Sequence, residues 1–369
     1  MPAPVSLGSY SYVQETKENL DWAELVTLDL SLYDTPGGKK ELASFLLKAL
    51  REKGFFYVKN FNISQEAVNR QFALGKEFYE LPLEEKLKYV PEGLDDGKFN
   101  GYVPAGRRVV DAASGLRDRV EVYNIPKFNG SFKHEHPELL KEHIQEIETF
   151  ARSLHTEVLD RLHVLLAIAL ELPEDYFINI HQYEVKSEDH LRYMKYSKYT
   201  PEENEKIGNV WVRGHTDLGS FTLLFRQPVA ALQIRDPVHN EWKWVKPQDA
   251  TLTVNACDAL SFLTGGYVKS TIHRVVAPPK DQQHVDRLGL LYFSRPHNDV
   301  VLRTANESPV LQRAGYTQNS FEKSGNHVPT SEEWTFAKQK WQRTKNVPTN
   351  DPKHGTAVIL PGFQEQLYA

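Results

Sequence analysis

Residues 213–225 read RGHTDLGSFTLLF, and the interpretation of the whole chain starts from this stretch. A His-x-Asp pair, His215 and Asp217, comes directly before an apolar run that is typical of a β-strand. In a strand, residues i and i+2 point to the same face. We therefore expect the imidazole of His215 and the carboxylate of Asp217 to project together into one cavity.

A second strand-like run, STIHRVV at residues 270–276, places His273 58 positions after His215. Two histidines and one carboxylate on a rigid sheet form the facial triad that suits non-haem Fe(II) and leaves positions open for substrate and O₂. The sequence therefore predicts that His215, Asp217 and His273 are the metal ligands and the catalytic residues. The competing interpretation is a set of structural histidines with no bound metal.

The chain has 14 histidines, so other groupings must be considered. His284 and Asp286 repeat the His-x-Asp spacing, but they lie in a polar, proline-containing loop with no strand to hold them. The segment HEH at residues 134–136 is polar, and we interpret it as a solvated turn. A zinc hydrolase also uses two histidines and a carboxylate, but the sequence has no His-Glu-x-x-His motif to supply its general base.

The composition is that of an ordinary globular protein. Of 369 residues, 40% are hydrophobic and 25% are charged, and the formal net charge is -5, so we expect a sizeable core and no basic stripe for nucleic acid. The single cysteine, Cys257, excludes an internal disulfide framework and a multi-thiolate zinc site. Residues 1–12 lack a signal-peptide pattern, and no apolar run approaches the roughly 20 residues of a membrane span. These features predict a cytoplasmic protein without membrane or nucleic-acid partners.

Hydrophobic periodicity predicts helices mainly in the first half of the chain and short strands in the second. Helices are expected at 40–53, 65–81, 331–343 and, as one long helix or two, at 137–172. Early strands are expected at 23–30, 55–60 and 120–124. Later strands are expected at 191–196, 210–214, 220–225, 230–235, 242–245, 252–256, 270–276 and 287–294. Short strands at such spacing are typical of a sandwich or barrel, and a double-stranded jelly roll is one solution.

The chain shows no repeats, no low-complexity segment and no clear linker, so we predict a single domain over residues 1–369. Within it, residues 1–185 form a supporting strand and helix region, 186–300 form the catalytic core, and 301–369 form a C-terminal helix and tail. The apolar end of the tail, residues 358–363, is expected to pack back onto the core as a cover.

The motifs around these residues resemble those of the 2-oxoglutarate/iron(II)-dependent oxygenase superfamily, isopenicillin N synthase-like group. The resemblance extends from about Leu25 to Pro296. It rests on GFFYV at 54–58, FYELPLEEK at 78–86, HTD at 215–217, Asn255 with Asp258, and KSTIHRVV at 269–276. It implies that His215, Asp217 and His273 bind iron. It also implies a fold that is mainly β with flanking helices, namely a double-stranded β-helix (jelly-roll) core backed by N-terminal helices.

The same resemblance implies residues for the oxoacid co-substrate. The family holds its far carboxylate with an arginine on the strand after the distal histidine, which here is Arg287, 14 positions beyond His273. A bidentate guanidinium suits a buried carboxylate. A tyrosine also contributes, and the matching residue is Tyr196, with Tyr193 and Tyr199 as alternatives. The family usually reads Arg-x-Ser where this chain has Arg287-Leu288-Gly289, so the hydroxyl donor is missing and the use of 2-oxoglutarate stays open.

The function that the resemblance implies is an Fe(II)- and 2-oxoglutarate-dependent dioxygenase that consumes O₂ and releases succinate and CO₂. It would oxidise a C–H bond of a small organic molecule, by hydroxylation, desaturation or cyclisation, in specialised metabolism. Candidate substrate contacts are Phe293, Arg107, Arg108 and Tyr102. The alternatives are an iron oxidase of the same fold that does not use 2-oxoglutarate and a non-catalytic jelly-roll binding protein. We expect a monomer or weak homo-oligomer.

Overall fold

The computed structural model of the protein describes residues 7–344 and 356–366, and its centre consists of two facing β-sheets. The large sheet has the strand order β1 (Thr27–Asp29), β2 (Phe55–Lys59), β12 (Thr251–Ala256), β9 (Phe221–Phe225), β14 (Arg287–Phe293), β7 (His190–Tyr196), β6 (Val120–Pro126) and β3 (Gly101–Val103). The small sheet has the order β11 (Trp242–Trp244), β10 (Leu232–Arg235), β13 (His273–Val276) and β8 (Val210–His215). This arrangement confirms the predicted fold class, a jelly-roll core with flanking helices.

The eight strands predicted between residues 191 and 294 are all present, with ends shifted by no more than three residues. The first predicted strand, 23–30, is shorter than expected. It ends at Asp29, whose carboxylate accepts a hydrogen bond from the backbone N–H of Ser31 and starts a 3₁₀ turn at Leu30–Leu32. This local side-chain cap explains the end of the strand, whereas its start lies at Thr27, four residues later than predicted.

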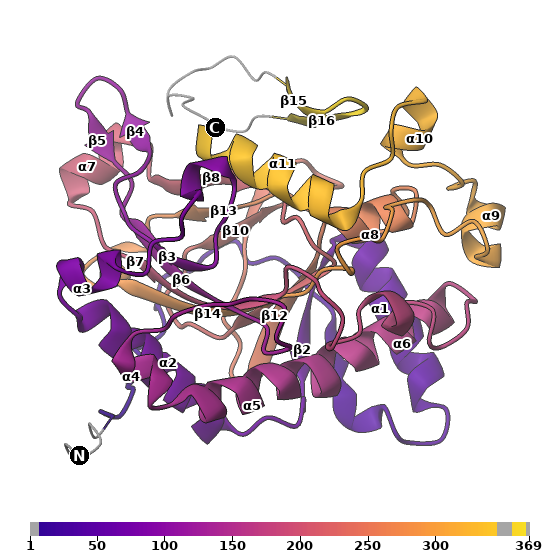
Figure 1. The fold of residues 1–369 in the computed structure, drawn as a ribbon, viewed down its shortest axis with the longest axis horizontal. Helices are drawn as coiled ribbons and strands as arrows, with labels where there is room; N and C mark the ends of the chain where they lie inside the picture. The colour runs from indigo at the N-terminus through magenta and orange to yellow at the C-terminus, as the bar shows by residue number, and fades with distance from the viewer. Residues whose placement is uncertain (1–6, 345–355, 367–369) are drawn as a thin grey trace.

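Helices cover the outer face of the large sheet (Figure 1). They are α1 (Gly38–Glu52), α2 (Gln65–Glu80), α5 (Ile144–Leu154) and α6 (Asp160–Ala169). Side chains alternate between the two faces of β9 and β14. Leu223 and Tyr292 are buried in the cluster that contains these helices, whereas Thr222 faces inward and contacts Asp217. The helices thus stabilise the outer face of the sheet whose inner face carries the candidate site.

Gly54 joins α1 to β2 and fixes the helix close to the strand that carries His273. Its φ of +68° lies in the left-handed region that favours glycine. A Cβ at this position would lie 2.5 Å from the carbonyl oxygen of Lys269, which precedes β13. Any side chain would therefore force the two segments apart.

The predicted helical segment 137–172 is interrupted. It forms α4 (Glu138–Lys141), α5, a π-helical turn at His155–Leu159 and α6. The backbone of His143, with φ -113° and ψ 13°, separates α4 from α5. Leu140, Leu154 and Leu166 all reach the core, so the hydrophobic pattern identified the buried face correctly, and the break at His143 corresponds to the predicted alternative of two helices.

The C-terminal part lies on the opposite side of the core from α2 and α5 (Figure 1). It contains α11 (Ser331–Thr344) and the hairpin of β15 (Thr356–Leu360) and β16 (Phe363–Gln366). The ring of Phe363 packs against Phe262 and Trp334, with centroids 5.3 and 5.0 Å apart. The tail therefore packs back onto the core, as its apolar sequence predicted.

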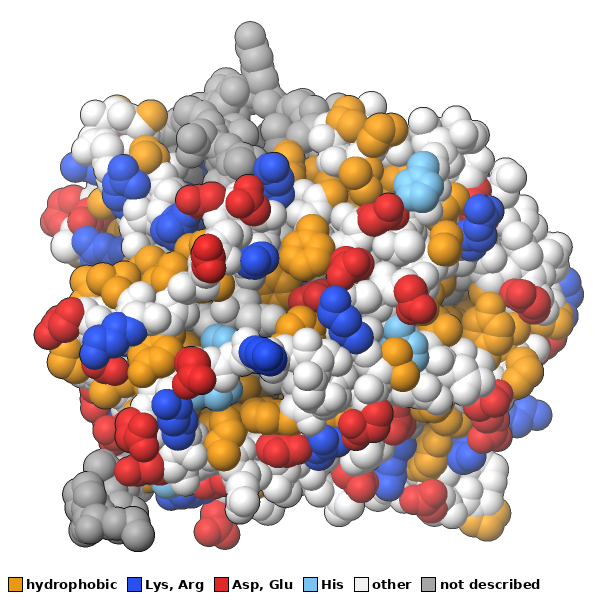
Figure 2. Space-filling model, viewed as in Figure 1, with side chains coloured by type: hydrophobic (Ala, Val, Ile, Leu, Met, Phe, Trp, Pro, Cys, Tyr) orange, Lys and Arg blue, Asp and Glu red, His pale blue; other side chains and the backbone are white. Residues whose placement is uncertain are grey.

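The remaining elements are short. They are α3 (Leu83–Leu87), β4 (Val109–Asp111), β5 (Leu116–Arg117), α7 (Pro201–Lys206), α8 (Asp258–Leu263), α9 (Pro309–Ala314) and α10 (Ser320–Ser324). Across the described part of the chain, each helix is too short or too polar to cross a membrane. On the face shown in Figure 2, acidic and basic side chains are interspersed.

Candidate active site

The three predicted metal ligands converge where β8 and β13 pair. His215 is the last residue of β8 and His273 is the first of β13, and the two are direct partners in the antiparallel register. Asp217 lies in the turn that follows β8, and its Oδ1 is 3.9 Å from Nε2 of His215 and 3.7 Å from Nε2 of His273. The three ligand atoms lie within 4.8 Å of one another. The turn, rather than strand alternation, therefore brings Asp217 to the same point as His215.

Hydrogen bonds orient each ligand towards this point. Nδ1 of His215 donates to the carbonyl of Arg213 at 2.8 Å, and Nδ1 of His273 donates to the carbonyl of Thr271 at 3.2 Å. A carbonyl can only accept, so each Nδ1 carries a proton, and in the neutral ring the lone pair lies on Nε2, the atom that faces Asp217 and can bind a metal.

The carboxylate of Asp217 is held in the same way. Its Oδ2 accepts from the hydroxyl of Thr222 at 2.8 Å and from the amide of Asn255 at 3.0 Å. Its Oδ1 therefore faces the two imidazoles. Asn255 was noted in the sequence only for its family resemblance, and the structure shows what its side chain contacts.

The electrostatics of the trio favour the protonation state that binds a cation. Burial lowers the pKa of His215 to about 3, with a further contribution from His273, so its imidazole is neutral. Burial alone would raise the pKa of Asp217, but His273, His215 and the two hydrogen bonds outweigh it and lower the pKa. Neutral imidazoles and an ionised carboxylate are the forms that bind divalent metals. Two nitrogens and one oxygen on three protein ligands fit non-haem Fe(II) with open positions.

Among residues 7–344 and 356–366, this trio is the one group of His, Cys, Asp and Glu side chains close enough to share a metal ion. Asp286 instead contacts Lys195 and the backbone N–H of Lys198, so the second His-x-Asp pair has a surface role.

The prediction for the HEH segment was wrong. His136 is buried, and the hydroxyl of Tyr123 lies 2.9 Å from its Nδ1 and 3.2 Å from Nε2 of His134. The segment therefore packs against β6 rather than forming a solvated turn. Burial lowers the pKa of His136 to about 3.

Arg287 and Tyr196 form a second polar group on the inner face of the large sheet. They are direct partners in the register of β14 and β7, and the guanidinium carbon lies 5.2 Å from the centre of the tyrosine ring. Arg287 is 5% exposed, and its Nε has no hydrogen-bond partner among the described residues. Burial lowers its pKa. A buried cation with an unused donor suits a carboxylate ligand.

The two alternatives to Tyr196 have other roles. Tyr193 points to the outer face of the sheet, where its hydroxyl donates to Oε1 of Gln71 at 2.8 Å. The hydroxyl of Tyr199 donates to the carbonyl of Arg117 at 3.4 Å. Of the three tyrosines, Tyr196 is the one that stacks over Arg287.

Gly289 stands two positions after Arg287 on the same face of β14, where a serine hydroxyl would be expected from the resemblance. A Cβ added there would lie 3.3 Å from Cδ1 of Leu291 and 3.5 Å from Cβ of Met194. These are tight but not forbidding distances, since the nearer atom is the end of a flexible side chain. The position therefore lacks the hydroxyl, and a Cβ there would need only a small shift of the Leu291 side chain.

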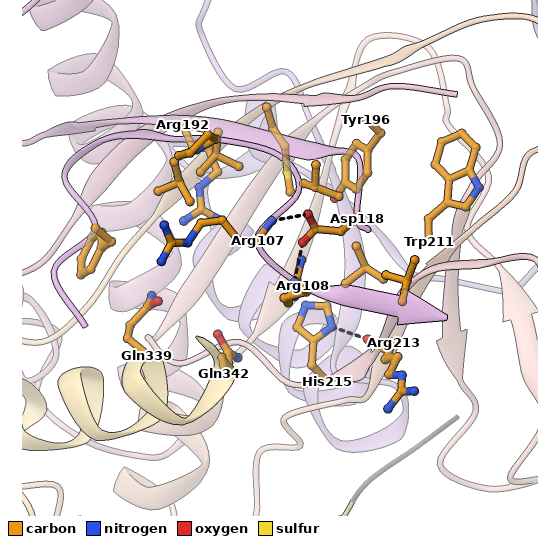
Figure 3. Close-up of a pocket in the computed structure, with 18 of the residues that line it drawn as sticks. Arg107, Arg108, Asp118, Arg192, Tyr196, Trp211, Arg213, His215, Gln339 and Gln342 are labelled. Atoms are coloured by element: carbon orange, nitrogen blue, oxygen red, sulfur yellow. Dashed lines mark hydrogen bonds and ion pairs between the residues drawn. The ribbon is translucent and has the colours of Figure 1, made fainter. Parts of the chain in front are cut away.

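A cavity of about 410 Å³ opens beside His215 (Figure 3). Arg192 and Tyr196 of β7 line one side of it, and Gln339 and Gln342 of α11 line the opposite side. The cavity also reaches Trp211 of β8. Arg192, Trp211 and the α11 residues were not singled out from the sequence, because neither a motif nor periodicity distinguishes them from core or surface residues.

The predicted substrate contacts have different positions. Arg107 and Arg108 line the cavity, but Arg107 is paired with Asp95, and Nε of Arg108 lies 2.8 Å from Oδ2 of Asp118. Phe293 stacks against the ring of His190 at 4.7 Å.

Tyr102 lies in the core instead of the cavity wall. It is 1% exposed, and its hydroxyl donates to Oε2 of Glu121 at 2.6 Å. Its prediction as a substrate contact is therefore corrected. The sequence around it contains glycines and is typical of a loop, but residues Gly101–Val103 form strand β3, and the pairing of β3 with β6 turns this ring inward.

Comparison with known proteins gives two family matches along the chain. Residues 25–144 match a family model described as non-haem dioxygenase in morphine synthesis N-terminal. Residues 187–296 match a model described as the 2OG-Fe(II) oxygenase superfamily. The second match contains all three predicted metal ligands and Arg287.

Relatives and solved structures agree with these matches. A 2-oxoglutarate-dependent dioxygenase, gloE of Glarea lozoyensis, is 30% identical over 301 residues, which cover 77% of this chain and 84% of that protein. The UPF0676 protein C1494.01 of Schizosaccharomyces pombe is 34% identical over 285 residues, with coverages of 76% and 84%. A crystal structure of a full-length Neurospora crassa protein in complex with alpha-KG and thymine has a TM-score of 0.75 at 24% identity and covers 88% of this chain and 99% of that one. This last similarity supports the fold.

Proposed function

Because the chain belongs to the 2OG-Fe(II) oxygenase superfamily, we propose that it oxidises a C–H bond of a small organic molecule of specialised metabolism, by hydroxylation, desaturation or cyclisation. The chain is a 2-oxoglutarate-dependent dioxygenase by family, and this family uses Fe(II), 2-oxoglutarate and O₂. The observation that carries the proposal is the convergence of His215, Asp217 and His273 beside a cavity. A volume of about 410 Å³ suits a small-molecule ligand.

In the proposed mechanism His215, Asp217 and His273 hold Fe(II), and the residues around them set its position. When bound, the metal supplies the oxidising chemistry that couples the conversion of 2-oxoglutarate and O₂ into succinate and CO₂ to cleavage of the substrate C–H bond. Thr222 and Asn255 keep Asp217 aimed at the metal position. Since buried polar groups of this kind are held before the ligand arrives, little reorganisation is needed on binding.

Arg287 binds the far carboxylate of 2-oxoglutarate, and Tyr196 supports it from the neighbouring strand. The buried position of Arg287 and its unused Nε donor support this role. Arg107 and Arg108 contribute to the wall of the substrate cavity while remaining paired with their acidic partners. Phe293 contributes the apolar surface beneath the guanidinium of Arg192.

The second candidate function is an iron oxidase of the same fold that takes its electrons from the substrate without 2-oxoglutarate. Gly289 is the observation that favours it, because the usual hydroxyl donor beside Arg287 is absent. The retained buried arginine argues for the co-substrate. The two functions differ in one measurable property, which is whether the iron-loaded protein binds 2-oxoglutarate.

We would add Fe(II) and 2-oxoglutarate to the purified protein without oxygen and follow the visible charge-transfer band of the chelate. If the protein is a dioxygenase, we expect this band in the wild type and its loss in His273→Ala. In Arg287→Met the band should need at least about 30-fold more 2-oxoglutarate, because a buried charge pair is removed. Arg313→Gln, an exposed arginine paired with Glu171, is the matched control. Iron binding without a band would support the oxidase, and failure to bind iron would contradict the ligand assignment.

The proposal also covers the cellular location, oligomeric state and partners of the enzyme. We infer a cytoplasmic monomer or weak homo-oligomer that acts on a small molecule and not on nucleic acid. The single cysteine, which is buried, supports a reducing compartment. The formal net charge of -5 disfavours a polyanionic partner such as nucleic acid, and acidic and basic side chains are interspersed on the face in Figure 2.

A further inference from the structure

We propose that the substrate is a carboxylic acid and that Arg192 binds its carboxylate in the cavity beside the metal centre. This inference rests on the proposed function and specifies its substrate class. Arg192 lies on β7, and both its side chain and that of His215 line the cavity. In Figure 3 its guanidinium extends from the strand towards the cavity.

The guanidinium is held by two neutral acceptors. Its Nε donates to Oδ1 of Asn124 at 2.6 Å, and one terminal nitrogen lies 3.3 Å from Nε2 of His190. Nδ1 of His190 donates to the carbonyl of Glu188 at 3.0 Å, so its Nε2 is an acceptor. Burial lowers the pKa of His190 well below its usual value, which keeps the ring neutral.

Among residues 7–344 and 356–366, no carboxylate forms an ion pair with this guanidinium, and the carboxylate whose charge acts on it, Asp217, is one of the three proposed metal ligands. Burial, with a further contribution from the nearby cation Arg295, lowers the pKa of Arg192 to about 10. A guanidinium has five N–H donors, of which these contacts use two. The remaining donors and the net charge are therefore available to an anion in the cavity.

The contrast with two other arginines of the cavity supports this assignment. Arg107 and Arg108 are already paired with Asp95 and Asp118 at the cavity wall. Arg192 instead stacks on the ring of Phe293, with its guanidinium carbon 4.4 Å from the centroid. Stacking and hydrogen bonds to two neutral groups fix the position of the guanidinium without an ion pair that would neutralise its positive charge.

The co-substrate has its own arginine. Arg287 pairs with Tyr196, which is four residues from Arg192 along β7, a backbone separation of about 13 Å. The four C–C bonds of 2-oxoglutarate span at most about 6 Å. With one carboxylate at Arg287 and the other end at the metal centre, a second acid is the natural partner of Arg192. A carboxylate there would receive the two parallel hydrogen bonds that guanidinium groups make with such ligands.

The test uses a set of small carboxylic acids, each matched with its primary amide, on protein loaded with Zn(II) and 2-oxoglutarate. Binding is measured by saturation-transfer NMR, and turnover by succinate release from the iron-loaded protein in air. We expect at least one acid of the set to bind, and each acid that binds should do so at least tenfold more tightly than its matched amide. Arg192→Gln should abolish this preference, and the exposed control Arg313→Gln should retain it.

Three results would overturn the inference: a set that yields no acid ligand, ligands bound equally well as acid and amide, or acid binding that is unchanged in Arg192→Gln. If Arg192→Gln weakens the 2-oxoglutarate charge-transfer titration tenfold and leaves acid binding unchanged, Arg192 serves the co-substrate and the inference fails. A wild-type protein without that band would contradict the proposed function itself.

A second variant covers the case in which Arg192→Gln does not fold. Arg192→Lys keeps the charge but loses the planar fork, so it should retain the preference for acids with at least fivefold weaker binding. Acid affinity equal to that of the wild type would contradict a bidentate role for this residue.

Discussion

Lys338 of α11 links the C-terminal helix to the metal centre. Its Nζ is fully buried and donates to the hydroxyl of Thr216, the residue between two metal ligands, at 2.6 Å. It also forms ion pairs with Asp258 and, at 3.2 Å, with Glu365 of β16. Burial would lower the pKa of Lys338, but the two carboxylates outweigh it and raise the pKa. A charged ammonium therefore connects the helix, the tail hairpin and the metal-binding turn.

We predict that Lys338→Met lowers the free energy of unfolding by about 3–5 kcal/mol, because it removes the ion-pair partner of the buried carboxylate of Asp258. The methionine keeps most of the aliphatic volume, so the loss reports mainly the charge. The double variant Lys338→Met/Asp258→Asn also removes the charge of Asp258. Its loss of unfolding free energy should therefore be smaller than the sum of the losses in the two single variants. Because Thr216 would also lose its donor, the Fe(II) dissociation constant should rise by about tenfold.

The assay is urea unfolding of the metal-free protein, followed by tryptophan fluorescence, with Fe(II) affinity measured separately without oxygen. The matched control is Lys186→Met, which removes a surface ion pair with Glu332 whose side chains are 53% and 43% exposed. Its effect should be no more than about 1 kcal/mol. The reasoning is refuted if Lys338→Met is as stable as this control, or if the losses of the double variant are strictly additive.

Three further predictions concern the site and its surroundings. Asp217→Ala should abolish succinate production. Thr222→Val removes only a supporting hydrogen bond and should reduce Fe(II) affinity about 10- to 100-fold, and Asp217→Ala should reduce it by more. Equal losses of Fe(II) affinity in the two variants would contradict the assignment of Asp217 as a ligand. Gly289→Ser should tighten 2-oxoglutarate binding about fivefold through one added hydrogen bond of about 1 kcal/mol, whereas Gly289→Ala should not. Weaker binding of 2-oxoglutarate by the serine variant, measured by the charge-transfer titration, would show that the space beside Leu291 is too small. The pKa of His136 is about 3 in the fold and about 6.5 when unfolded, so its contribution to stability is present above pH 6.5 and is lost as the pH falls towards 3. Urea unfolding should therefore lose about 2 kcal/mol from this residue between pH 7.5 and 5, and the same pH slope in His136→Gln would contradict this.

Much of the β core could be predicted because its signal is local. The strand that carries His215 begins with Val210, Trp211 and Val212, and the strand that carries His273 ends with Val275 and Val276, which are β-prone residues. The spacing of His215 and Asp217 predicted that their side chains lie close together, and they do, although a turn, rather than alternation along a strand, brings them together. The jelly roll and the role of Arg287 came from resemblance, since hydrophobic alternation alone does not determine how strands pair.

Long-range contacts explain what could not be predicted. The HEH segment looks polar in sequence, but His136 is buried because Tyr123 of β6 packs beside it. Tyr102 was expected at the cavity, but the pairing of β3 with β6 turns it towards Glu121. Arg192 has no sequence motif around it, and its significance comes from hydrogen bonds to neutral groups where Arg107 and Arg108, at the same cavity, have acidic partners. Each of these properties depends on residues that are distant in sequence.

The position of α11 bears on how substrate choice and metal binding are separated in this enzyme. Trp334 donates from Nε1 to the carbonyl of Leu218 at 3.2 Å, and Lys338 donates to Thr216, so one face of the helix holds the metal-binding turn. Gln339 and Gln342 lie on the cavity wall opposite Arg192. Substitutions at the two glutamines change the shape and polarity of the cavity without removing any contact to the turn, whereas substitutions at Trp334 or Lys338 loosen the turn itself. Substitutions at Gln339 and Gln342 can therefore alter which acid is accepted while Fe(II) affinity and the 2-oxoglutarate chelate remain unchanged. One face of α11 thus influences substrate selectivity, and the other supports the metal-binding turn.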